Sequence, residues 1–301
     1  MRPAPVYLPL QEKVQPMKKR LFIISLVFVV ALLLLSLTGY CMLFKRSYGT
    51  YFEHEGNRLF YTEAGEGEPI ILLHGFAVNG DLNWRLTGMI ETLSKAYRDL
   101  VLDQRGHGLS SKPHEPEAYG EEMTHDVIRL MDHLNIKKAH VAGYSLGGYV
   151  ALKSASLHPD RLLTAGVLGA GWQDPDDERS QQSFAAFEKI AEQLESGRGV
   201  QPVATMFSEE NHQPTLWHRT QVKLVSSLLG DKQALAAMLR NVRGLSLDSK
   251  EVAAIKVPVL IVCGDLDPNY TSAVKLKEAL PACEFITVPN RSHPATALSD
   301  E

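Results

Sequence analysis

The chain has 301 residues, 45% hydrophobic and 22% charged, so it contains enough apolar material for a large buried core. Its formal net charge of −4 excludes the strongly basic field that attracts nucleic acid. The three cysteines, Cys41, Cys263 and Cys283, are too few for a disulfide framework and lack metal-ligand spacing, so we expect no metal and no cofactor. The sequence does not decide whether Cys263 and Cys283 form a disulfide.

The N-terminal region predicts an interaction with a membrane. Residues 1–20 form a proline-containing tail that ends in the basic stretch Lys18–Arg20, and residues 21–44 are 24 residues without a charge. A helix of about 20 apolar residues crosses the hydrocarbon core, so we predict a transmembrane anchor. The charge bias predicts a cytoplasmic N-terminus and an extracytoplasmic remainder. The alternatives are a signal peptide followed by secretion, and a true start at Met17.

From Tyr48 onward, short apolar strands alternate with helical periods. Residues 51–63 predict two short strands around a Gly-Asn turn. Further strands are expected over 69–73, 98–102, 139–142, 162–168, 257–263 and 284–288, with helical spacing over 84–96, over 127–134 and after residue 145. This alternation predicts an α/β fold with a doubly wound, mostly parallel sheet. We assign residues 48–172 and 251–301 to that core.

Residues 173–250 interrupt the alternation. Apolar residues recur there at helical spacing in three stretches, around Phe184, Val222 and Leu235, and no strand pattern separates them. We predict a helical cap over the edge of the sheet, in preference to a separate helical domain.

A Gly-Tyr-Ser-Leu-Gly turn over residues 143–147 joins a predicted buried strand to a predicted helix. Such a turn exposes the hydroxyl of Ser145 only where neighbouring side chains are absent, and the two glycines remove them. The N–H of Leu146 then begins a helix that points at any oxyanion formed there.

A serine hydroxyl needs a histidine base, and the base needs a carboxylate that fixes its tautomer. His74, Asp103 and Ser145 all fall at carboxyl ends of predicted strands, which meet at one edge of a parallel sheet. After Ser145, the loops that follow strands offer Asp265 or Asp267, and then His293. The order Ser, Asp, His is the one used by α/β hydrolases.

Across residues 50–300 the chain resembles the α/β-hydrolase superfamily. The matching motifs are Leu72-Leu73-His74-Gly75-Phe76, Asp103-x-Arg105-Gly106-His107-Gly108-x-Ser110, Gly143-x-Ser145-x-Gly147-Gly148, Gly264-x-x-Asp267 and the late His293. The resemblance implies Ser145 as nucleophile, His293 as general acid and base, and Asp267 as the orienting acid. It also implies an oxyanion hole from the N–H groups of Phe76 and Leu146. One departure is that only eight residues follow His293, where the family has a longer helix.

The resemblance implies a serine hydrolase, in the first place for a small carboxylic ester. Lipase, thioesterase, C–C hydrolase and haloperoxidase chemistry remain alternatives, as does a non-catalytic binding protein with a hydrolase fold. Epoxide hydrolases and dehalogenases carry Asp at the position of Ser145, which disfavours them. The large aromatic residues of the cap region are candidates either for an acyl pocket or for packing: Trp172, Phe184, Phe207 and Trp217.

Overall fold

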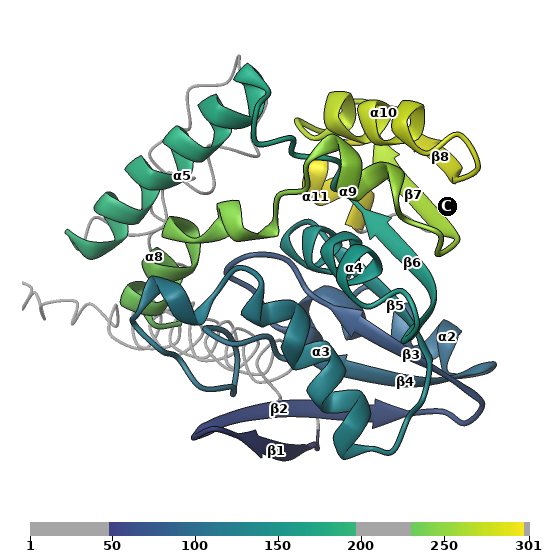
Figure 1. The fold of residues 1–301 in the computed structure, drawn as a ribbon. Helices are drawn as coiled ribbons and strands as arrows, with labels where there is room; N and C mark the ends of the chain where they lie inside the picture. Colours follow the sequence, from purple (N-terminus) through teal and green to yellow (C-terminus); the bar gives the residue numbers. More distant parts are fainter. Residues whose placement is uncertain (1–47, 197–229, 298–301) are drawn as a thin grey trace, which may run out of the picture. The chain divides into compact units, whose positions relative to one another are not determined.

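The computed structural model describes residues 48–196 and 230–297. Within these residues, eight strands form one sheet in the order β1-β2-β4-β3-β5-β6-β7-β8 (Figure 1). The strands are β1 Thr50–His54, β2 Asn57–Ala64, β3 Glu68–Leu73, β4 Tyr97–Leu102, β5 Ala139–Tyr144, β6 Leu162–Leu168, β7 Val259–Gly264 and β8 Glu284–Val288. Strand β2 pairs antiparallel with β1 and β4, and all other pairs are parallel. The predicted mostly parallel sheet is therefore confirmed.

The β1–β2 hairpin turns one residue earlier than the predicted Gly-Asn pair. Asn57 already pairs with His54, and the turn consists of Glu55 and Gly56 with φ of 47° and 78°. A two-residue hairpin turn of this kind needs positive φ at both central positions, which glycine adopts without steric cost.

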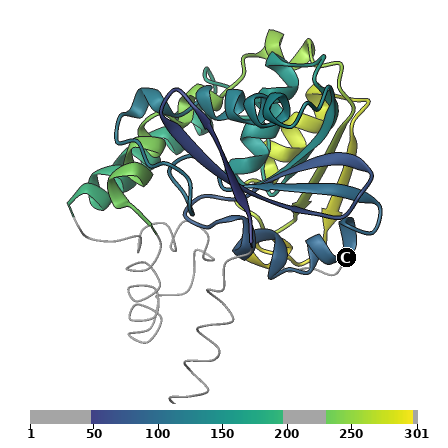
Figure 2. The ribbon, with the colours of Figure 1, turned by 90° about the horizontal axis from the view of Figure 1, so that it is seen from below.

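Helices cover both faces of the sheet (Figure 2). The α-helices of the described residues are α2 Met89–Leu93, α3 Glu122–His133, α4 Leu146–Leu157, α5 Glu178–Glu195, α8 Lys232–Arg240, α9 Ser249–Ala253, α10 Tyr270–Ala279 and α11 His293–Ala297, and the short turns are η1 Asp81–Arg85, η2 Pro116–Ala118 and η3 Val242–Leu245. Side chains of α3, α4 and α10 share one buried cluster, whereas those of η1, α2 and α11 join a cluster with Leu72 and Val101. The helix predicted over 84–96 is broken at Gly88, where φ is 74°.

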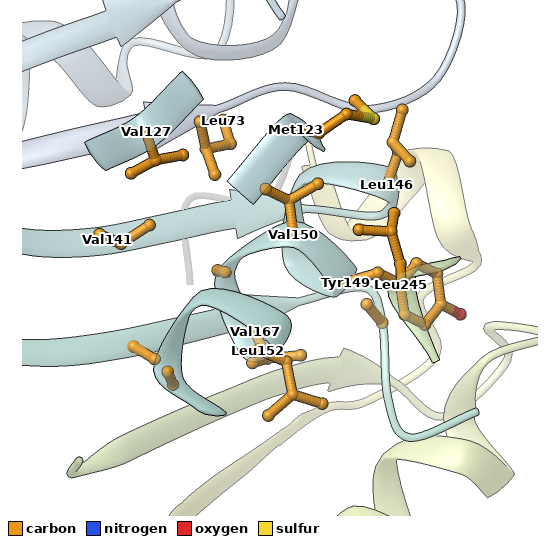
Figure 3. Packing of buried hydrophobic residues seen from close by; sticks show 14 of the residues in the cluster. Leu73, Met123, Val127, Val141, Leu146, Tyr149, Val150, Leu152, Val167 and Leu245 are labelled. Atoms are coloured by element: carbon orange, nitrogen blue, oxygen red, sulfur yellow. The ribbon is translucent and has the colours of Figure 1, made fainter. Parts of the chain in front are cut away.

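The core is centred on α4, which follows β5 (Figure 3). Val150 on α4, Val141 on β5 and Val167 on β6 are all completely buried. Burying a side chain of this size contributes about 1.5–3 kcal/mol. This packing fixes the start of α4, and therefore Ser145 immediately before it, against the strands.

Helices α5 and α8 lie between β6 and β7 in the sequence, and the described residues of that interval contain no strand (Figure 1). Arg240 on α8 holds Glu195 on α5 with two hydrogen bonds, Nε–Oε1 at 3.1 Å and Nη2–Oε2 at 2.9 Å. The next residue, Asn241, donates from Nδ2 to the carbonyl of Pro116 at 2.9 Å. These contacts attach the two helices to each other and to the loop that precedes α3.

Several sequence predictions lie outside the described residues: the tail 1–20, the apolar segment 21–44, Phe207, Trp217 and the helical stretch around Val222. Of the helices that are described, none has the length and apolar character needed to span a membrane. Cys263 and Cys283 are described, and both are buried free thiols with no bridge between them.

Candidate active site

Ser145 occupies a strained turn between β5 and α4. Its φ of 54° and ψ of −114° are rare for a residue with a side chain, and its N–H donates to the carbonyl of Leu168 at 2.8 Å. A Cβ on Gly143 would lie 1.9 Å from the carbonyl oxygen of Gly147, and a Cβ on Gly147 would lie 2.2 Å from that of Leu73. Both glycines are therefore needed for the turn to close against β3, as the motif predicts.

Asp267 and His293 meet at the carboxyl end of the sheet. His293 Nδ1 lies 2.7 Å from Asp267 Oδ2, and their residues are 6% and 4% exposed. The second carboxylate oxygen of Asp267 accepts the N–H of Asn269 at 2.8 Å. Asp265, the other carboxylate that the sequence offered, is exposed. The geometry therefore pairs the histidine with Asp267.

Tyr144 connects the His293 loop to the serine turn. Tyr144 immediately precedes Ser145, its ring centroid lies 5.2 Å from that of His293, and its hydroxyl donates to the His293 carbonyl. Burial and the nearby charge of Asp267 raise the pKa of Tyr144 above its usual value, so the hydroxyl keeps its proton and remains a donor. This contact holds His293 beside the turn that presents Ser145, which is 8% exposed.

Two backbone N–H groups next to Ser145 are available to an oxyanion. Within the described residues, neither the N–H of Phe76 nor that of Leu146 donates to an acceptor, and both residues line the same cavity as Ser145. The loop of Phe76 is shaped by His74, whose Nε2 accepts the N–H of Gln104 at 3.0 Å while Nδ1 lies 2.7 Å from the Gly75 carbonyl. This pattern requires the proton on Nδ1, so His74 supports the loop as a neutral ring.

The Asp103–Ser110 motif stabilises the neighbouring loops. Arg105 binds Asp126 of α3 through two hydrogen bonds of 2.6 Å, and both side chains are buried. His107 is also buried, and burial together with His74 lowers its pKa to about 3, so it is uncharged at neutral pH. Arg105, His107 and Asp126 therefore hold these loops together.

A cavity of about 230 Å³ has Ser145 in its wall. Its apolar lining residues come mainly from the cap helices: Leu146, Phe187, Ile190, Met238, Leu239 and Val242. Its polar lining residues come from the segment after β6, from α5 and from the loop after β7: Gln173, Arg179, Ser183 and Asn269. The cavity therefore suits a ligand that carries both apolar and polar groups.

Tyr149 connects polar residues of the cavity to Asp267. Its hydroxyl donates to Asn269 Oδ1 at 3.0 Å and accepts from Gln173 Nε2 at 3.4 Å. Asn269 in turn donates its N–H to Asp267. The cavity wall and the carboxylate of Asp267 thus belong to one hydrogen-bonded group.

The cavity differs from the predicted aromatic pocket. Trp172 donates its indole N–H to the carbonyl of Leu247 at 2.7 Å, and Phe184 packs against the core, so neither lines the Ser145 cavity. The packing interpretation of these two rings is confirmed. Sequence reasoning missed Gln173, Arg179 and Asn269 as cavity residues, because no motif contains Gln173 or Arg179 and Asn269 follows the Asp267 motif without a pattern of its own.

Comparison with known proteins agrees with this architecture. The profile of the alpha/beta hydrolase fold family matches residues 68–295. The chain therefore belongs to the alpha/beta hydrolase family. The AB hydrolase superfamily protein YisY of Bacillus subtilis is 27% identical over 261 residues, which cover 82% of this chain and 93% of YisY.

One further relative matches only part of the chain, and one solved structure has a similar fold. The dihydrolipoyllysine-residue acetyltransferase component of the acetoin cleaving system of Pseudomonas putida is 38% identical over 136 residues, 44% of this chain and only 35% of that relative. The enol-lactonase of Burkholderia xenovorans LB400 superposes with a TM-score of 0.65 at 23% identity, covering 81% of this chain and 92% of the enzyme. At that identity the superposition shows a shared fold.

Proposed function

We propose that the protein is a serine hydrolase that cleaves carboxylic esters through an acyl-enzyme. The observation that carries the proposal is the 2.7 Å contact between His293 and Asp267, held by Tyr144 beside the strained turn of Ser145. A carboxylate on Nδ1 fixes the proton there and leaves Nε2 as the base for a serine hydroxyl. The full set of three residues argues against the alternative of a non-catalytic binding protein.

The proposed reaction has two halves. Ser145 Oγ attacks the ester carbonyl and its proton passes to His293, while the N–H groups of Phe76 and Leu146 bind the oxyanion and Asp267 stabilises the imidazolium. The ester C–O bond then breaks, and the leaving alcohol takes the proton from His293. Water next attacks the acyl-enzyme, gives a proton to His293, and the acid leaves as Ser145 regains that proton.

A panel of p-nitrophenyl esters of rising chain length tests this function. The cavity of about 230 Å³ is smaller than the ~300–1,000 Å³ of typical drug-sized ligand sites, so we expect short acyl chains to react fastest. Ser145→Ala lowers kcat by at least about 1,000-fold, since only oxyanion stabilisation and binding remain. The matched control is Ser196→Ala at the exposed end of α5, which keeps wild-type rates. Turnover of no ester by the wild type rejects ester hydrolysis in favour of C–C hydrolase or haloperoxidase chemistry.

We also propose that residues 21–44 anchor the protein in a membrane with the catalytic domain outside the cytosol. The support is the uncharged length of that segment and the basic residues before it. An anchored chain stays in the membrane pellet after alkaline extraction, whereas a soluble product lacking residues 1–44 identifies the segment as a cleaved signal peptide.

A further inference from the structure

Arg179 is an exposed residue that lines the Ser145 cavity. It also lines a second cavity of about 130 Å³, which shares Gln173, Pro268 and Asn269 with the first. Its Nη2 donates to the carbonyl of Pro268 at 3.3 Å, directly after the proposed triad acid. In the part of the chain that the structure describes, its other N–H groups have no acceptor and no carboxylate lies within ion-pair distance. The guanidinium is therefore held at Pro268, which also lines both cavities.

Helix stability does not account for a cation at this position. Arg179 is the second residue of α5, where the positive end of the helix dipole disfavours a positive side chain. The nearby carboxylates are already engaged, since Lys275 lies 3.3 Å from Asp174 and 3.8 Å from Asp177, and Asp177 also caps α5. Among the described residues that line the Ser145 cavity, Arg179 is the single cation. Its exposed charge has no ion-pair partner among the described residues and can therefore pair with a ligand.

We propose that Arg179 binds a carboxylate on the substrate, so that the preferred substrates are half-esters of short dicarboxylic acids. The proposal rests on the ester hydrolysis proposed above. The guanidinium fork takes a carboxylate through two parallel hydrogen bonds, a geometry that Lys lacks. Apolar lining residues of the cavity, among them Phe187 and Leu239, contact the methylene chain between the carboxylate and the ester carbonyl. Ser145 attacks the ester end while Arg179 holds the other.

The test compares the monomethyl esters of succinate, glutarate and adipate with the corresponding dimethyl esters, by methanol release. The kcat/KM of each dimethyl ester is divided by two, because it has two ester groups. The wild type then shows a kcat/KM for the best half-ester that is at least about tenfold higher than for the corresponding dimethyl ester. Arg179→Gln lowers that value about 10- to 100-fold and changes the dimethyl ester less than about threefold. Arg179→Lys recovers part of the preference. The matched control is Lys189→Gln, an exposed cation of the same helix outside both cavities, which changes neither rate.

The carboxylate site is rejected if Arg179→Gln lowers kcat/KM equally for the half-ester and the dimethyl ester, or if the wild type does not prefer the half-ester. Ester hydrolysis stands in both cases. If the wild type hydrolyses neither compound, the p-nitrophenyl ester panel decides the proposed function, and calorimetry at low salt decides the inference separately. The site then requires that Ser145→Ala binds monomethyl adipate more tightly than dimethyl adipate and that adding Arg179→Gln abolishes the difference. Equal binding by the single and double variants contradicts it.

Discussion

Asp99 is a buried carboxyl in the middle of the sheet. It lies on β4, is completely buried, and neither of its carboxylate oxygens has a hydrogen-bond partner in the described structure. Burial without a partner disfavours the charged form and raises the pKa of Asp99 to about 6. Because the unfolded chain has an ordinary pKa near 3.8, the folded protein binds more protons between about pH 4 and 6. Stability therefore falls as the pH rises through that window.

Asp99→Asn removes the free-energy cost of burying a charged carboxylate without changing the shape of the side chain. At pH 7.5 we expect the free energy of unfolding of the variant to exceed that of the wild type by about 1–3 kcal/mol, and at pH 4 the difference shrinks toward zero. Urea denaturation of both proteins at the two pH values measures this difference in the free energy of unfolding. A variant that is less stable than the wild type at pH 7.5 contradicts the account, since that result requires a favourable partner for the charged carboxylate.

At the scale of single residues, the sequence indicated the proposed catalytic residues better than the residues that line the cavity. Ser145, Asp267 and His293 each follow a recognisable strand or motif, and the sheet brings strand ends together, so their meeting was predictable. Arg179 and Gln173 come from segments without a motif, and their places in the cavity wall depend on long-range packing. No local pattern contains that information.

The serine turn is the element whose shape depends most on missing side chains. A Cβ at residue 147 would approach both the carbonyl carbon and oxygen of Leu73, at 2.6 and 2.2 Å. These are backbone atoms of a central strand, which have no space to move. The start of α4 would have to shift away from β3, and Ser145, the proposed nucleophile, would shift with it.

Gly147→Ala is therefore expected to lower the free energy of unfolding by at least about 3 kcal/mol and to reduce ester turnover strongly. The matched control is Gly56→Ala in the β1–β2 turn, where φ is 78° and no atom lies within 4 Å of the new Cβ. In that variant only the left-handed backbone conformation lowers the free energy of unfolding, by about 1–2 kcal/mol. Thermal unfolding and kcat are measured on both. Equal losses in the two variants show that the close approach to β3 has no special effect.

In the whole molecule, alternating strands and helices predicted the parallel sheet, and helical periods predicted the helices between β6 and β7. The position of Trp172 was not predictable, because its indole N–H turns toward Leu247, 75 residues later. The broken helix at Gly88 was also missed, since a helical period alone does not show that one residue has positive φ. Local periodicity does not predict long-range packing or the backbone angles of single residues.

The central claim is that Ser145, His293 and Asp267 work as one unit, and labelling with a fluorophosphonate tests it most directly. We expect a single adduct, mapped to Ser145 by peptide mass spectrometry and absent in Ser145→Ala. Loss of the general base in His293→Ala slows labelling by about 100-fold or more, while the circular dichroism spectrum stays that of the wild type. An adduct on another residue, or a labelling rate that His293→Ala leaves unchanged, contradicts the account.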